Sequence, residues 1–361
     1  MKKALIASLL LLFLSSVARA QPSAPDSDSD EAGLAMQMTQ TEADIKNSSA
    51  LLRDAGLNDY LHGLVCQVAA GACAGLRVYI VENAGENIIA LPNGALVVWS
   101  GTLLRMENEA QLAHLLGHEI AHYQHKDSLS QYQRMLDTNG MVAVLGVAAS
   151  GIGMGFMGTP ASMAALGIRF PHSKTEEEEA DRAGFALATD AGYDPAAAEI
   201  IWRNADPEYL RQHPGSEARL AALQTMAQRL PAGAAWKTGT EIYQAAVQSY
   251  SERWVNDELL SSTDSVALFA RLSASDHGLF RYGLGEAYRK RGQPGDETLA
   301  AQAFHAALAA PDPQPLAWRG LGLVAMQNGD KAAARAAFRQ YRTALPFADD
   351  RAMIDYYLAQ P

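Results

Sequence analysis

Two histidines and one glutamate lie at a spacing that suits metal chemistry. His118 and His122 are four residues apart, so on a helix both imidazoles project from the same face and can bind one cation. Glu119 follows the first histidine, where its carboxylate can act as general base on a water that attacks a peptide carbonyl. Zinc in such a site lowers the pKa of the water and polarises the carbonyl. The motif therefore predicts a zinc-dependent peptidase site, with His118 and His122 as ligands and Glu119 as a catalytic residue.

A third protein ligand is expected, because a catalytic zinc commonly has three and leaves its fourth position to water. The acidic run from Glu176 to Asp181 offers a candidate. On a helix Glu177 and Asp181 share a face. Small residues nearby would allow that helix to approach the first one closely: Ala180, Ala183 and Gly184. We expect three of the four glutamates in the run to form a solvated helix face.

The surrounding sequence predicts the elements that hold the motif. Apolar residues at helical spacing predict a helix from about Glu107 to Leu136, and the acidic residues of its first turn suit the helix dipole. Apolar spacing between 41 and 71 predicts one or two packing helices. Three strand-like segments predict a small sheet, with a turn at Pro92-Asn93-Gly94 between the last two: 76–82, 87–91 and 95–100.

Between Asp137 and Arg169 there is no charged side chain, and Gly, Ala, Met and Val dominate. One interpretation is a membrane-facing or re-entrant hairpin, and the other is a pair of small-residue helices packed over the domain. We expect the helices, because Gly and Pro interrupt any spanning helix. Peripheral membrane contact through 140–168 stays open as the alternative.

The N-terminus has the pattern of an export signal. Lys2 and Lys3 precede an apolar run, and Ala18-Arg19-Ala20 places small residues where a signal peptidase cleaves. The apolar run is shorter than the ~20 residues that span a bilayer, and no cysteine follows the cleavage site. We therefore expect a signal peptide at 1–20, a periplasmic product without a lipid anchor, and a flexible leader at 21–40, which is rich in Ser, Asp, Ala and Pro.

Charge and cysteine content narrow the function classes. The chain has a net charge of -11, and removal of Lys2, Lys3 and Arg19 would take it to -14. Such an acidic surface argues against nucleic acid as a partner. The two cysteines, Cys66 and Cys73, suit a local disulfide in an oxidising compartment, and a free buried pair is the alternative.

Several motifs, in order, resemble one family. The matching pieces are Ala90–Gly94, Glu109–Ala113, Gly117–His122, Ser173–Asp181, and His213-Pro214 with Arg219. They resemble the zinc metallopeptidases of the HtpX and CAAX prenyl protease type, especially the soluble periplasmic, BepA/LoiP-like members. The resemblance covers roughly residues 50 to 225.

The resemblance implies roles for particular residues within a gluzincin-like core. Glu177 would be the third zinc ligand, with Asp181 behind it, orienting a ligand histidine. His213 would cap the metal or assist catalysis, and the alternative is an ordinary loop histidine. Arg219 would contact the substrate or the transition state. Strand 95–100 would be the edge strand that aligns an extended substrate. Three other histidines lack ligand spacing and are expected to be structural or solvent-facing: His114, His125 and His172.

The last third of the chain predicts helical repeats. Two sets of residues fall near the spacing of tetratricopeptide units: Leu284, Gly285, Tyr288, Ala300, Phe304 and Ala307, then Trp318, Leu321, Gly322, Ala325, Ala334, Phe338 and Pro346. Such stacks commonly bind peptides or proteins, and the alternative is that these helices only buttress the rest. We therefore expect a zinc metallopeptidase domain at 41–231 and an all-α, tetratricopeptide-like domain at 232–361.

Together these features predict an α+β, mainly helical protein with one Zn²⁺ per chain. The expected function is cleavage of misfolded or stalled envelope proteins, with the repeat region holding unfolded substrate or docking on outer-membrane assembly machinery. The alternative is a chaperone-like or adaptor protein whose protease site is largely self-inhibited. A pure binder has no use for both metal ligands and a base, so the enzyme is favoured by four intact residues: His118, Glu119, His122 and Glu177.

Overall fold

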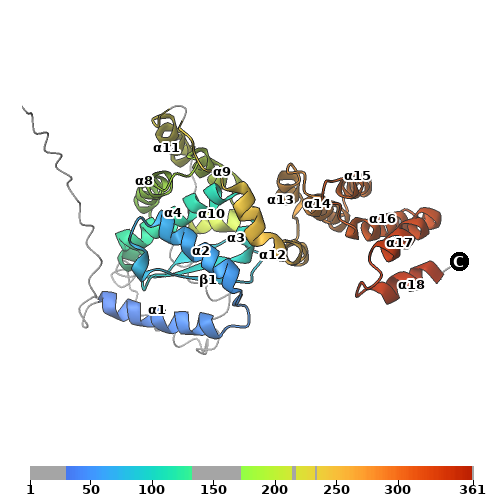
Figure 1. Ribbon diagram of the computed structural model, residues 1–361, viewed down its shortest axis with the longest axis horizontal. Helices are drawn as coiled ribbons and strands as arrows, with labels where there is room; N and C mark the ends of the chain where they lie inside the picture. Colours follow the sequence, from blue (N-terminus) through green and yellow to red (C-terminus); the bar gives the residue numbers. More distant parts are fainter. Residues whose placement is uncertain (1–29, 132–171, 214–216, 232–233, 360–361) are drawn as a thin grey trace, which may run out of the picture.

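The computed structural model describes residues 30–131, 172–213, 217–231 and 234–359 (Figure 1). The predicted signal peptide at 1–20, the leader residues 21–29 and the uncharged segment 140–168 lie outside the described residues. Within the described parts, no helix is both long and apolar enough to cross a bilayer. The predicted fold class is confirmed, since a mostly helical chain surrounds one three-stranded sheet.

The sheet contains the three predicted strands in the order β1-β3-β2: β1 (Arg77–Val81), β2 (Ile88–Ala90) and β3 (Ala95–Trp99). β3 pairs parallel with β1 and antiparallel with β2. Gly94 has φ +85° in the β2–β3 turn, where a Cβ would lie 2.2 Å from the Gly75 carbonyl oxygen. The prediction that strand 95–100 is an edge strand is wrong, because β3 is the central strand and β1 and β2 form the edges.

Helices cover both faces of the sheet (Figure 1). Ile80, Leu96 and Val98 pack with the helices on one side, which include α2 (Ala55–Val68) and α4 (Glu109–His125). α1 (Asp30–Asn47) packs on the other face through Leu34, Met38 and Ile45. The leader prediction is therefore wrong for residues 30–40, which are helical, because four-residue spacing lets a few apolar side chains share one face. Two short helices connect these elements: η1 (Cys73–Gly75) and α3 (Ser100–Arg105).

The motif helix α4 is shorter than predicted. Asn108 caps its N-terminus by accepting a hydrogen bond from the Gln111 backbone N–H. It ends at His125, because Lys126 adopts a left-handed conformation with φ 57°. Residues 132–136 of the predicted helix lie outside the described part of the chain.

The second site helix, α8 (Lys174–Asp190), crosses α4 at two glycines. A Cβ on Gly184 would lie 2.5 Å from the His118 backbone nitrogen, and one on Gly117 would lie 2.7 Å from the Gly184 carbonyl oxygen. Backbone therefore meets backbone at the crossing, as the small residues of α8 predict. Three helices follow: α9 (Ala196–Asn204), α10 (Pro207–Gln212) and α11 (Glu217–Gln228).

The hydrophobic core continues past the predicted domain boundary at 231. α12 (Thr240–Ser261) adds Tyr243, Trp254 and Val255 to the core that contains α2 and α4. In addition, Arg105 Nη2 on α3 lies 3.0 Å from Glu258 Oε2 on α12. Packing of the first domain thus extends into α12, whereas the domain boundary at 231 stays a prediction.

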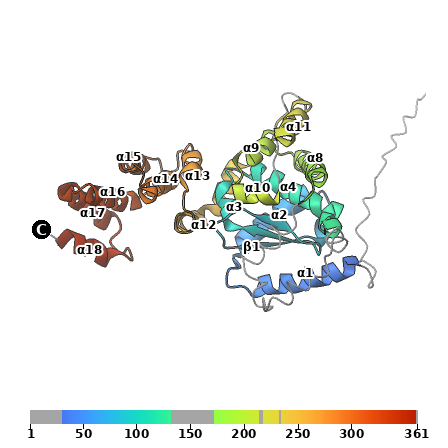
Figure 2. The same ribbon diagram turned by 180° about the vertical axis from the view of Figure 1, so that it is seen from behind.

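Beyond α12 the elements of the described residues are all helices, and they extend to one side of the molecule (Figures 1 and 2). Apart from Pro346, which follows the second pair, the predicted repeat residues fall on two helical pairs, in which Phe304 packs over Gly285 and Phe338 packs over Gly322. The pairs establish the helical region, whereas its tetratricopeptide class stays a prediction. The helices are α13 (Val266–Leu272), α14 (Gly278–Arg291), α15 (Asp296–Leu308), α16 (Leu316–Gln327), α17 (Lys331–Ala344) and α18 (Arg351–Ala359).

Candidate metal centre

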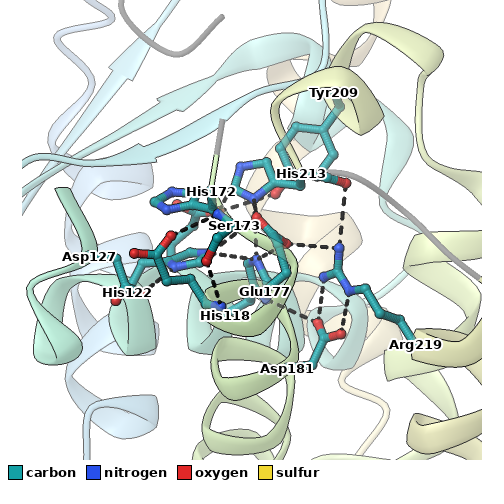
Figure 3. Close-up of polar contacts among 12 residues, drawn as sticks. His118, His122, Asp127, His172, Ser173, Glu177, Asp181, Tyr209, His213 and Arg219 are labelled. Carbon is teal, nitrogen blue, oxygen red and sulfur yellow. Dashed lines mark hydrogen bonds and ion pairs between the residues drawn. The ribbon is translucent and has the colours of Figure 1, made fainter. Parts of the chain in front are cut away.

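Four side chains from three parts of the chain converge at the crossing of α4 and α8 (Figure 3). His118 and His122 come from α4, Glu177 from α8, and His213 from the residue after α10. Nε2 of His118 lies 3.0 Å from Nε2 of His122 and 3.3 Å from Nδ1 of His213. Oε1 of Glu177 lies 3.2 Å from Nδ1 of His213 and 3.7 Å from Nε2 of His122. All four side chains are buried.

These atoms fit a zinc ion. Donors around a tetrahedral zinc, with bonds of 2.0–2.1 Å, are about 3.3 Å apart, close to the separations found here. Imidazole nitrogens with one carboxylate are also a donor set that zinc prefers. Among the described residues no hydrogen bond reaches the buried Oε2 of Glu177, although Nη1 of Arg219 lies 2.8 Å away.

The ionised side chains at the centre favour the binding of a cation. Burial opposes charge on His118, but Asp181 and Glu177 outweigh that effect and raise its pKa to about 9. Burial and the neighbouring charged His118 hold the pKa of His122 well below its usual value. Burial would raise the pKa of Glu177, yet His213 and His118 bring it far below the ordinary range. The carboxylates that stabilise an imidazolium here would equally stabilise a bound cation.

Glu119 lies beside the four donors and is itself buried. The Tyr209 hydroxyl donates a hydrogen bond of 3.2 Å to Oε1 of Glu119, and Nε2 of His213 lies 3.5 Å from the same oxygen. Burial raises the pKa of Glu119, while His213 and His118 oppose that rise. A carboxylate with a raised pKa exchanges protons closer to neutral pH, which suits a general base.

Asp181 and Arg219 lie to one side of the four donors, next to His118 and Glu177 (Figure 3). Nδ1 of His118 lies 3.2 Å from Oδ1 of Asp181. Arg219 donates a hydrogen bond of 2.7 Å to the same oxygen and one of 2.6 Å to Oδ2. Burial would raise the pKa of Asp181, but the Arg219 and His118 contacts outweigh it and lower that pKa. Arg219 is 2% exposed and lies over the Trp202 ring. This placement favours orientation of Glu177 and Asp181 by Arg219 over the predicted direct contact with substrate.

Sequence reasoning missed two residues that contact His122. Nδ1 of His122 lies 2.7 Å from Oδ2 of Asp127. The His172 ring stacks on the His122 ring, with 3.7 Å between the ring centroids. His172 therefore belongs to the site, contrary to prediction, whereas His114 is buried against the Asp194 carbonyl and His125 is exposed, as predicted. A carboxylate five residues after His122 was visible in the sequence, but helical periodicity gave no reason to select it.

Two smaller predictions have clear outcomes. Glu176 is buried rather than solvated, because it forms a capping box with Ser173 at the start of α8. The Ser-x-x-Glu spacing was a signal that could have identified it. The structure joins Cys66 and Cys73 in a disulfide, as predicted for an oxidising compartment.

Comparison with known proteins finds similarity over the part of the chain that contains this centre. Residues 53–227 match Peptidase family M48. The M48 segment includes His118, Glu119, His122 and Glu177, and it also contains His213 and Arg219.

Similarity to curated proteins extends over the same region. The chain is 30% identical over 206 residues to the Beta-barrel assembly-enhancing protease of Yersinia pestis, which is 52% of this chain and 42% of the relative. Identity is 27% over 207 residues to the protein of that name from Escherichia coli, with the same coverage. It is 29% over 173 residues to the mitochondrial metalloendopeptidase OMA1 of Bos taurus, which is 41% of this chain and 32% of the relative. The chain thus spans about a third to two fifths of the length of these relatives.

Proposed function

We propose that the protein is an exported zinc-dependent endopeptidase of the gluzincin type. The convergence of His118, His122 and Glu177 beside Glu119 carries this proposal, because metal donors and a general base are brought together by separate helices. The metalloendopeptidase relatives and the M48 match support it.

The residues have distinct tasks in this mechanism. His118, His122 and Glu177 would hold the zinc, which supplies polarisation of the scissile carbonyl and a lowered pKa of water. Glu119 accepts a proton from the water that attacks the carbonyl carbon, and it delivers that proton to the amine as the C–N bond breaks. Tyr209 holds the Glu119 carboxylate in place through its hydroxyl.

His213 supports the second candidate function, a chaperone-like or adaptor protein with a largely self-inhibited protease site. Its Nδ1 lies among the donor atoms, 3.3 Å from Nε2 of His118 and 3.2 Å from Oε1 of Glu177. A fourth protein donor there would take the position that catalytic zinc sites leave open. We favour an enzyme that His213 restrains, because Glu119 remains beside the donors.

We propose misfolded or stalled envelope proteins as substrates, with the helical region contacting them or outer-membrane assembly machinery. The signal-like residues 1–20 support a periplasmic location. The name of the Yersinia pestis relative, a beta-barrel assembly-enhancing protease, supports a link to envelope assembly. Because β2 is an edge strand of the sheet and α4 packs near it, β2 is our candidate for aligning an extended substrate.

Glu119→Gln tests the proposed activity. Glutamine keeps the size of the side chain but cannot accept the proton, so casein cleavage should fall about 10²- to 10⁴-fold while one zinc per chain is retained. Metal analysis and cleavage assays on purified mature protein would measure both. Glu178→Gln, at a partly exposed position on α8, is the matched control. Undiminished cleavage by Glu119→Gln would rule out this mechanism.

A further inference from the structure

The second nitrogen of His122 has a specific partner. Nδ1 of His122 lies 2.7 Å from Oδ2 of Asp127, and both residues are buried, at 2% and 4% exposure. A neutral imidazole has one N–H, so if Nε2 presents its lone pair to a cation, the proton is on Nδ1. The short contact is then a hydrogen bond that His122 donates to the Asp127 carboxylate.

A local change in the backbone makes this contact possible. In a continued α-helix Asp127 would point about 140° away from His122 around the axis, since five residues rotate the chain through about 500°. Instead α4 ends at His125, and Lys126 adopts φ 57° with its N–H bonded to the carbonyls of His122 and Tyr123. Because of this turn, the carboxylate of Asp127 lies beside the His122 ring (Figure 3).

The two α4 histidines differ in how they are held. Nδ1 of His118 lies 3.2 Å from Asp181 but makes no hydrogen bond to any described residue, and both carboxylate oxygens of Asp181 accept bonds from Arg219. Nδ1 of His122 meets both the distance and the geometry of a hydrogen bond. The His172 ring, stacked at an interplanar angle of 9°, restricts the other direction of movement.

We propose that Asp127 is a positioning residue for metal binding, which accepts the Nδ1–H of His122 and thereby fixes the tautomer and ring direction that present Nε2 to the cation. This inference rests on the proposed zinc site. Carboxylates in this position tune metal affinity through the ligand they orient, typically by about 10- to 100-fold. Asp127 acts through His122 and touches neither the water nor the substrate.

The test is the zinc affinity of Asp127→Ala and Asp127→Asn, measured by competition with a chromophoric chelator. We expect affinity to fall about 10- to 100-fold in the alanine variant and by less in the asparagine variant, whose amide oxygen can still accept the bond. In zinc-loaded protein with ¹⁵N-labelled histidine, the downfield Nδ1–H resonance of His122 should be present in the wild type and lost with alanine. Asp190→Asn, at the exposed end of α8, is the matched control.

The outcomes separate this inference from the proposed function. A wild type that binds one zinc, with both Asp127 variants within about twofold of its affinity, would overturn the positioning role alone. Two zinc ions per wild-type chain, the second lost with Asp127, would also overturn it, because His122, Asp127 and His172 would then form a separate site. A wild type that binds no zinc would overturn both proposals. Asparagine is nearly isosteric, so it keeps the test valid if the alanine variant does not fold.

Discussion

At the scale of single residues, the centre contains more polar groups than a catalytic zinc needs. Three protein donors would suffice, yet His213 provides a fourth, and its Nε2 lies 3.5 Å from Glu119, the proposed general base. The His213 ring therefore lies next to both the other donor atoms and the Glu119 carboxylate. Movement of His213 away from the donors would open a coordination position and release Glu119 at the same time.

His213→Ala tests this arrangement. Three donors remain, so zinc content should stay at one per chain, and casein cleavage should rise several-fold because a position for water becomes available. Cleavage and metal content of the purified variant would be measured beside His125→Ala, which removes an exposed histidine of α4. Lower cleavage with zinc retained would instead show that His213 assists the reaction.

At the scale of elements, the centre depends on how closely two helices approach. His118 is next to Gly117, and Glu177 and Gly184 lie two turns apart on α8. Because the backbones touch at the two glycines, the ligand carboxylate reaches the histidines directly. Any added volume at the crossing must move α8, and Glu177 with it.

Gly184→Ala is therefore expected to separate the helices. Overpacking against backbone costs about 1–3 kcal/mol, and the displaced Glu177 should weaken zinc binding. Urea unfolding and chelator competition would measure the two effects. Gly63→Ala on α2 is the matched control, because nothing lies within 4 Å of the added Cβ, and it should stabilise the protein by about 0.5–1 kcal/mol. Wild-type zinc affinity in Gly184→Ala would contradict the close-approach argument.

The elements also show what could be predicted from sequence. The strands and the two site helices follow from local periodicity and turn residues, and the metal motif follows from fixed spacing on one helix. The order of the strands cannot be predicted from local periodicity, because it is decided by tertiary pairing. β3 is therefore the central strand rather than the predicted edge strand. The left-handed Lys126 has no local signature, since glycine is the usual residue there. Asp127 therefore could not be assigned to His122 beforehand.

At the scale of the whole molecule, α12 joins the segment that matches Peptidase family M48 to the C-terminal helices, and a largely buried ionic cluster lies at the junction. Arg105 of α3 lies 3.0 Å from Glu258 of α12, 3.6 Å from Asp206 and 3.9 Å from Glu86 in the β1–β2 connection. Asp206 directly precedes α10, the helix that leads to His213. The cluster thus connects the sheet, the His213 segment and the helical region.

Glu86 should make the stability of this junction depend on pH. Burial raises its pKa to about 7, although Arg105 and the Asp206 backbone N–H oppose the rise. A carboxyl whose folded-state pKa exceeds its unfolded value of 4.5 contributes fully below pH 4.5 and loses that contribution as pH rises through 7.

Glu86→Gln removes this titration, because the amide stays neutral at every pH. Between pH 4.5 and 8 the wild type should lose about 3 kcal/mol of unfolding free energy relative to the variant. Urea unfolding at both pH values would measure the difference, with Glu178→Gln as the partly exposed control. Parallel pH profiles for wild type and Glu86→Gln would mean that Arg105 keeps Glu86 ionised in the folded protein. The junction would then be held by a charged network at both pH values, and its stability would not depend on the titration of Glu86.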